Sequence, residues 1–72
     1  MPNHNLTPRE IDILSLLAQG LSRKETAQIL GITLNMVNTY CQHINNKLDV
    51  HSTHDAIVAA KLSGLLKEVQ NA

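Results

Sequence analysis

The segment from Ala27 to Leu48 places the strongest constraint on how this chain can fold. A short helix is predicted before Gly31 and a longer amphipathic helix after Thr33, which leaves only a tight turn between them. The small side chain of Ala27 permits a close helix crossing, Gly31 permits a positive φ, and Val37 lies on the inner face of the second helix. This pattern indicates a helix-turn-helix, a unit whose second helix can enter the DNA major groove.

Length and composition limit the rest of the molecule. The chain has 72 residues, with one tyrosine and neither phenylalanine nor tryptophan. A single small domain with a core of Leu, Ile, Val and Ala is therefore predicted, and such a core favours a helical bundle over a sheet. The formal net charge is zero, whereas domains that bind nucleic acid are usually basic.

Cysteine content and the N-terminal sequence indicate a reducing compartment. Cys41 is the single cysteine, so no disulfide can form within the chain. A signal-peptide pattern is absent, and so is an apolar run near the roughly 20 residues of a membrane span. We therefore expect a cytoplasmic location and no membrane contact. The expected organisation is a flexible lead or linker stub over residues 1–5, a domain over residues 6–66 and a frayed tail over residues 67–72.

Capping signals and glycines divide the domain into four predicted helices. A hydroxyl residue stands at each start, in two cases with glutamate three residues later, and a glycine follows three of the four ends. The predicted spans are 7–19, 22–30, 33–48 and 53–63. The fold class is all-α, a four-helix bundle that contains the helix-turn-helix. The predicted caps are Thr7, Ser22, Thr33 and Ser52, and the terminating glycines are Gly20, Gly31 and Gly64.

The predicted helix over residues 33–48 has two different faces at 100° per residue. Its apolar face contains Val37, Tyr40, Cys41, Ile44 and Leu48, and we interpret Cys41 as a core residue rather than a redox sensor. The opposite face carries amides and threonine, where a merely solvated face is usually rich in Lys and Glu. Amides can hydrogen-bond adenine, and a threonine methyl can contact thymine. The residues predicted to face bases are Asn38, Thr39, Gln42, His43 and Asn46.

Several residues beside this polar face are suited to the phosphate backbone. Cations stand at the start of the second predicted helix and at the end of the third, and helix N-terminal amides also bind phosphate. So few cations imply that a dimer or a tethered domain must add to the affinity. The predicted backbone contacts are Arg23, Lys24, Thr33, Asn35, Met36 and Lys47, and His43 and Asn46 fit either role.

The predicted helix over residues 53–63 is rich in small residues, which would let another helix come close. One of its faces is expected to pack on its own chain, and a second face, around Ile57 or Val58, is expected to form a homodimer. The predicted dimerisation residues are Ala56, Ile57, Ala59, Ala60 and Ser63.

The sequence provides no pattern for catalysis, a metal or a cofactor. His4, His43, His51 and His54 lack a metal-ligand spacing with cysteine or acidic residues. No Ser/His/Asp arrangement, carboxylate pair or glycine-rich phosphate loop stands out. We therefore expect neither an enzyme nor a metal or cofactor site.

A longer set of residues matches one family pattern without a gap. These residues are Leu6-Thr7-Pro8-Arg9-Glu10, Leu14, Leu17-Ala18-Gln19-Gly20-Leu21-Ser22, Lys24-Glu25, Ala27, Leu30-Gly31-Ile32, Val37, Ile44, Lys47-Leu48, Val50, Ala56 and Gly64-Leu65. In these motifs the chain resembles the LuxR/FixJ/GerE-type helix-turn-helix. The resemblance implies a four-helix domain of a bacterial transcription regulator, whose third helix reads DNA and whose fourth dimerises on a two-fold site. It implies double-stranded DNA, a second copy, an upstream regulatory domain and RNA polymerase as partners.

The chain departs from the family pattern where cationic DNA contacts are usual. The family usually has Thr, Lys and His at the positions of Met36, Asn38 and Tyr40. Three further departures replace Ile by Thr26, Gly by Asp49 and Arg by Thr53. The scaffold is therefore kept while the cationic contacts are fewer.

Three alternatives remain open at the level of sequence. The first is an ordinary helical hairpin with a solvated polar face. The second is a LuxR-like interaction module that blocks a full-length regulator as an inactive heterodimer, and the zero net charge favours it. The third is a promoter-reading domain of a sigma factor, which uses a related fold, although the stretch from Leu6 to Ser22 is LuxR-like.

Overall fold

The computed structural model describes residues 6–66, and within this range all regular structure is helical. The elements are α1 (Pro8–Ala18), α2 (Arg23–Leu30), α3 (Leu34–Leu48) and α4 (Thr53–Ser63). The predicted all-α fold and its four helices are confirmed to within one residue at each end, a difference smaller than the usual uncertainty of helix boundaries. The predicted lead over residues 1–5 and tail over residues 67–72 lie outside the described residues.

Local hydrogen bonds explain where each helix begins. Both predicted capping boxes are present: the N-cap hydroxyl accepts a bond from the N3 backbone N–H, and the N3 glutamate accepts one from the N-cap N–H. Hydroxyl caps also begin α3 and α4. The N-cap residues are Thr7, Ser22, Thr33 and Ser52, as predicted.

Left-handed backbone conformations end α2 and α3. Gly31 has a φ of 70° and turns the chain from α2 toward α3, as the sequence predicted. Asp49 ends α3 with a φ of 58°, which is unusual for a residue with a side chain. Aspartate tolerates this conformation better than most residues, because its short polar side chain can bond locally. The turn after α3 is therefore kept, although the glycine usual in the pattern that this chain resembles is absent.

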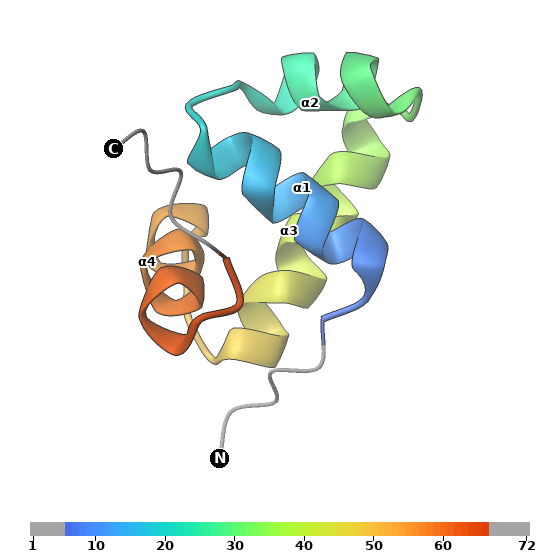
Figure 1. The fold of residues 1–72 in the computed structure, drawn as a ribbon. Coiled ribbons are helices and arrows are strands. Elements are labelled where there is room, and N and C mark those ends of the chain that lie inside the picture. Colours follow the sequence, from blue (N-terminus) through green and yellow to red (C-terminus); the bar gives the residue numbers. More distant parts are fainter. Residues whose placement is uncertain (1–5, 67–72) are drawn as a thin grey trace, which may run out of the picture.

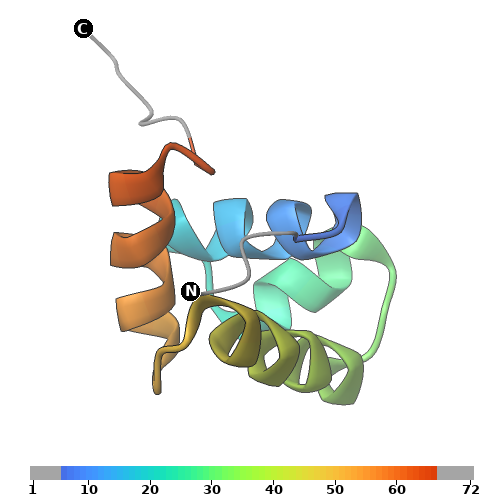
Figure 2. The ribbon, with the colours of Figure 1, turned by 90° about the horizontal axis from the view of Figure 1, so that it is seen from below.

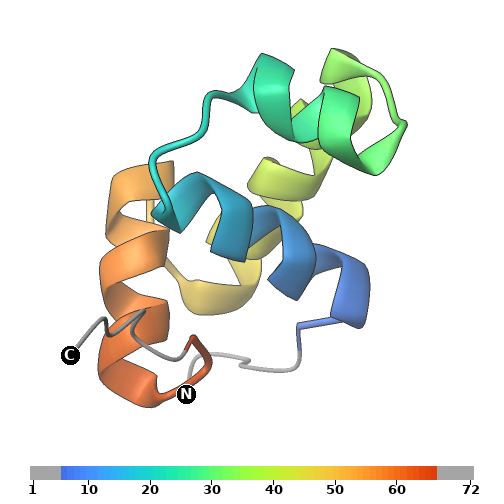
Figure 3. The same cartoon turned by 45° about the horizontal axis from the view of Figure 1, so that its top comes forward.

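Helix α3 is the element on which the other helices pack. It contacts α1, α2 and α4, and it crosses behind α1 in Figure 1. Seen from below, α3 forms one long edge of the molecule, with α1 on the opposite side and α4 at one end (Figure 2). In Figure 3, α2 lies at the end of the molecule opposite the C-terminal half of α4. One long side of α3 is consequently left free of other helices.

The core is built from aliphatic side chains of all four helices, as the composition predicted. Cys41 is only 4% exposed, which confirms its interpretation as a core residue. Tyr40 was predicted on the same apolar face and is half-buried against the core. The buried apolar residues are Ile13, Leu14, Ala27, Val37, Cys41, Ile44, Leu48, Ala56, Ala60 and Leu66.

Two residues predicted to form a dimer interface belong to this core instead. Ala56 and Ala60 have no exposed surface, so they cannot contact a second copy while the domain is folded. Their small size serves the packing of α4 on α1 and α3 of the same chain. The sequence prediction for these two residues was wrong, because a small side chain permits close approach to either partner.

Thr26 is a fully buried polar residue whose Oγ1 makes no hydrogen bond within residues 6–66. A buried hydroxyl without a partner has lost its bonds to water and gained none in return. We expect Thr26→Val, which keeps the shape of the side chain, to raise the free energy of unfolding by about 1 kcal/mol. Urea unfolding followed by circular dichroism measures the change. Thr26→Ser keeps the hydroxyl, and we expect it to lower stability; a valine variant no more stable than the wild type would contradict the prediction.

Candidate nucleic-acid interface

The free side of α3 carries most of the residues that were predicted to face bases. The side chains of Thr39, Gln42, His43 and Asn46 are exposed along it. They are spaced at three- and four-residue intervals, so they form one stripe on the helix surface. Asn38 differs, because it is only partly exposed and is bonded to a neighbouring helix.

Two open grooves follow this stripe. The first has a volume of about 380 Å³ and borders the N-terminal half of α3, where the exposed Met36 gives it an apolar wall. The second has a volume of about 250 Å³ and borders the C-terminal half. The first groove is lined by Asn35, Met36, Thr39, Tyr40 and His43, and the second by Gln42, Asn45, Asn46, Val50 and His51. The exposed surface of α3 therefore presents amide, methyl and ring groups and few charges.

Arg23 connects three helices through hydrogen bonds at one end of the stripe. Its Nη1 donates a hydrogen bond to Oδ1 of Asn38 across 2.7 Å, and its Nη2 donates one to Oγ1 of Thr53 across 2.8 Å. Arg23 is the first residue of α2 and Thr53 the first of α4, so the guanidinium joins their N-terminal ends to α3. Two of its five N–H groups are used, and the other three point to no acceptor among the described residues.

The sequence prediction missed this connection, because it treated Arg23 and Asn38 as independent DNA contacts. A signal for it was present in the sequence. The family usually has cations at the positions of Asn38 and Thr53, and this chain has a hydrogen-bond acceptor at both. Two acceptors in place of two cations indicate a nearby donor, and the fold shows that donor to be Arg23.

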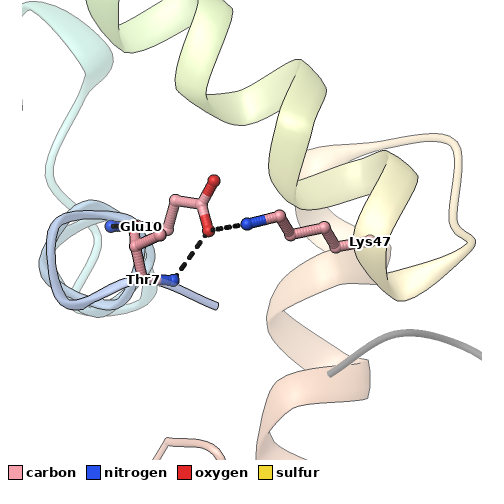
Figure 4. A network of polar contacts seen from close by, with 3 residues as sticks. All are labelled: Thr7, Glu10 and Lys47. Carbon is pink, nitrogen blue, oxygen red and sulfur yellow. Dashed lines mark hydrogen bonds and ion pairs between the residues drawn. The ribbon is translucent and has the colours of Figure 1, made fainter. Parts of the chain in front are cut away.

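Lys47 faces the interior rather than the free side of α3. Its Nζ donates to Oε1 of Glu10 across 2.8 Å, and the same oxygen accepts the backbone N–H of Thr7 (Figure 4). The side chain of Glu10 is 4% exposed and that of Lys47 is 28% exposed. Lys47 was predicted to contact phosphate, and the structure instead places its charge on a buried carboxylate that joins α3 to the start of α1.

The pKa of Glu10 reflects this environment. Burial alone would raise the pKa, because it disfavours the charged form. The hydrogen bond from Lys47, those from the backbone and the side chain of Thr7, and the attraction of the Lys47 charge oppose burial and together exceed it. The pKa of Glu10 therefore lies below its ordinary value of 4.5, and the carboxylate is charged at neutral pH.

The other predicted backbone contacts lie on the surface near the start of α2 and α3. Lys24 and Asn35 are exposed. The hydroxyl of Thr33 accepts the backbone N–H of Met36, so its oxygen serves as a helix cap while its O–H remains a donor. Met36 is 42% exposed, but its side chain has no N–H or O–H and its backbone N–H already donates to Thr33, so it offers no hydrogen bond to a phosphate.

Helix α4 presents an apolar surface away from the core. Val58 is 42% exposed and Leu62 is 84% exposed, and their four-residue spacing places them on one face. Of the predicted dimerisation residues, Ile57 and Ala59 are half-buried and Ser63 is exposed. The outward face of α4 is therefore centred on Val58 and Leu62.

Residues 6–66 provide neither a metal site nor a membrane span. No group of three His, Cys, Asp or Glu side chains there is arranged to hold a metal ion. None of the four helices combines the length and the apolar character that a membrane span requires.

The match to a family model decides the family of this four-helix domain. Residues 4–60 match the family model described as bacterial regulatory proteins, luxR family. The chain belongs to the luxR family. This confirms the resemblance inferred from the motifs in Leu6–Leu66. The family consists of DNA-binding transcription regulators and is not a family of enzymes.

Relatives of this luxR-family domain are longer regulatory proteins. It is 39% identical to the transcriptional regulatory protein LiaR of Bacillus subtilis (strain 168) over 66 residues, covering 92% of this chain and 31% of LiaR. It is 44% identical to the nitrate/nitrite response regulator protein NarL of Escherichia coli (strain K12) over 55 residues, covering 76% of this chain and 26% of NarL. The chain thus spans less than a third of each relative.

Solved structures show the same fold. The crystal structure of Escherichia coli SdiA superposes with a TM-score of 0.86 at 31% sequence identity, covering 94% of this chain and 29% of SdiA. The order of the four helices is therefore that of a luxR-type domain.

Proposed function

We propose that this domain binds double-stranded DNA sequence-specifically as the output domain of a bacterial transcription regulator, with α3 in the major groove. The observation that carries the proposal is the free side of α3, where Thr39, Gln42 and Asn46 are exposed while the opposite face forms the core. A groove-binding helix needs such a side. LiaR and NarL are longer and are named as regulators, which supports a further regulatory domain; we place it upstream, as the resemblance implies. The expected compartment is the cytoplasm, and RNA polymerase is a further proposed partner.

We propose the following roles for individual residues, on the basis of their exposure and hydrogen bonds. Thr39 and Gln42 are assigned to base edges, because they are exposed at the middle of the stripe. His43 and Asn46 are assigned to bases or phosphates. Lys47 is assigned a positioning role, since it holds α3 against α1 through Glu10. The proposed phosphate contacts are Lys24, Thr33, Asn35 and the remaining N–H groups of Arg23.

A selection from a randomised duplex library, at low and at moderate salt, tests the function. We expect enrichment of a two-fold symmetric sequence, and a salt dependence that is shallow per monomer because few phosphates are neutralised. A domain that dimerises but selects no sequence at low salt would overturn the proposal.

One observation favours a second candidate, an interaction module that forms an inactive heterodimer with a longer regulator. The formal charge is zero, and both Arg23 and Lys47 are engaged within the fold. This candidate predicts that the domain selects no DNA sequence at low salt and that it binds a full-length luxR-family regulator.

We propose that homodimerisation uses the face of α4 around Val58 and Leu62. Burial of two exposed aliphatic side chains against the same pair in a second copy would remove apolar surface from water. We expect Leu62→Asp to abolish dimerisation on a palindromic duplex, as measured by sedimentation velocity, and to leave binding to a single half-site unchanged. Ile29→Asp is the matched control, because Ile29 is an exposed aliphatic residue of α2. If Leu62→Asp dimerised at the same protein concentrations as the wild type, the assignment of the dimer interface to this face of α4 would be contradicted.

A further inference from the structure

The amide of Asn38 has a chemically determined orientation. The group that faces it is Nη1 of Arg23, 2.7 Å from one of the two terminal amide atoms. A guanidinium has five donors and no acceptor, so the facing amide atom must be the oxygen. The reverse orientation would place two N–H groups against each other. Oδ1 of Asn38 therefore points to Arg23 on α2.

A second bond holds the guanidinium in place. Nη2 of Arg23 donates to Oγ1 of Thr53 across 2.8 Å, so the planar group is attached at both of its ends. Bonds from a charged donor are shorter and stronger than bonds between neutral groups. The amide oxygen of Asn38 is thus occupied by a donor that is itself anchored to α4.

The opposite end of the same amide is unoccupied. Among residues 6–66, the side chain of Asn38 makes one hydrogen bond, the one from Arg23 to its Oδ1. Its Nδ2 therefore makes none there. Asn38 is also partly exposed, next to Thr39 and four residues before Gln42. It therefore presents two N–H donors to a ligand on the α3 surface, with its acceptor engaged elsewhere.

We propose that Asn38 determines specificity by selecting guanine at the base pair that it faces; this inference rests on the proposed DNA binding. An asparagine that reads adenine must accept from N6 with its oxygen and donate to N7 with its nitrogen. Guanine presents two acceptors in the major groove, N7 and O6, and suits a group that only donates. Cytosine presents an N–H₂ donor and is disfavoured. Arg23 is the positioning residue that converts Asn38 from an adenine reader to a guanine reader.

The test is base selection by three variants of the domain. Asn38→Ala is used first, to locate the base pair that Asn38 faces. That base pair is the one at which the variant loses the base preference of the wild type. The wild type should favour guanine over adenine there by about tenfold. Arg23→Met removes the donors and releases Oδ1, and the preference should move to adenine. Lys24→Met is the matched control, because it removes one positive charge from the neighbouring position of α2 without touching Asn38; it should weaken binding and leave the preferred base unchanged.

A second measurement changes the DNA instead of Arg23. Replacement of the selected guanine by 7-deazaguanine removes the N7 acceptor and should weaken wild-type binding several-fold. If circular dichroism shows that Arg23→Met does not fold, the comparison with Asn38→Ala decides the matter, because that variant should bind both duplexes equally. Adenine at the selected position, or binding unaffected by 7-deazaguanine, would overturn the inference and leave the proposed function standing. A wild-type domain that selects no sequence would overturn both.

Discussion

Replacement of Lys47 by methionine is expected to lower the free energy of unfolding at neutral pH by about 2–3 kcal/mol. The variant leaves the carboxylate of Glu10 buried with only Thr7 as a hydrogen-bond partner among residues 6–66. Removal of one member of a fully buried pair costs more, about 3–5 kcal/mol, but Lys47 is 28% exposed and water partly replaces it. Urea unfolding followed by circular dichroism provides the measurement. The loss is large for a domain of this size, whose total stability is small.

The loss of stability in Lys47→Met is expected to depend on pH. The pKa of Glu10 is lowered in the folded state, so the unfolded state binds more protons over the acid range. The stability that Glu10 contributes is therefore present above its ordinary pKa of 4.5 and is lost as the pH falls through its folded value. Without Lys47, burial dominates and the pKa of Glu10 rises. The difference between variant and wild type should thus be greatest at neutral pH. It should shrink as the pH falls, first through the raised pKa of Glu10 in the variant and then through its lowered pKa in the wild type.

Lys61→Met is the control for this experiment. Lys61 is an exposed lysine near the end of α4 and has no ion-pair partner among residues 6–66. We expect it to change stability by less than about 0.5 kcal/mol at any pH. The double variant Glu10→Gln with Lys47→Met should be more stable than Lys47→Met alone, because the buried charge is gone. A Lys47→Met variant whose loss did not depend on pH would show that the ion pair is not its cause.

Gln42→Ala is expected to weaken binding to the selected DNA site by about 1–3 kcal/mol and to leave binding to random duplex almost unchanged. Gln42 is exposed at the middle of the α3 stripe, and its neutral amide releases no counterion from DNA. Its contribution should therefore depend on the base that it meets. Titration of the variant against both duplexes at one salt concentration measures the difference.

Lys24→Ala is the contrasting variant. Lys24 is an exposed cation at the start of α2, and a phosphate contact there is independent of sequence. Its loss should weaken binding to both duplexes alike and reduce the slope of affinity against salt by about one. If Gln42→Ala also weakened both duplexes alike, Gln42 would not read bases.

The sequence alone was sufficient for the helices and most of the core. Each helix start was predicted because a cap is a bond between residues three positions apart, as in the pair Thr7 and Glu10. The buried face of α3, with Val37, Ile44 and Leu48, followed from helical periodicity. The motifs resembled those of the luxR family, and the match of residues 4–60 to the family model confirmed that resemblance.

The partners of the polar side chains were decided by the tertiary structure. Lys47 and Glu10 are 37 positions apart, and Arg23 lies 15 positions from Asn38 and 30 from Thr53. In the sequence each cation equally suits a phosphate or a buried acceptor. Ala56 had the same ambiguity, because a small residue suits either a core or an interface. Local bonds and periodicity depend on neighbours along the chain, whereas these assignments depend on how the helices are rotated and packed against one another.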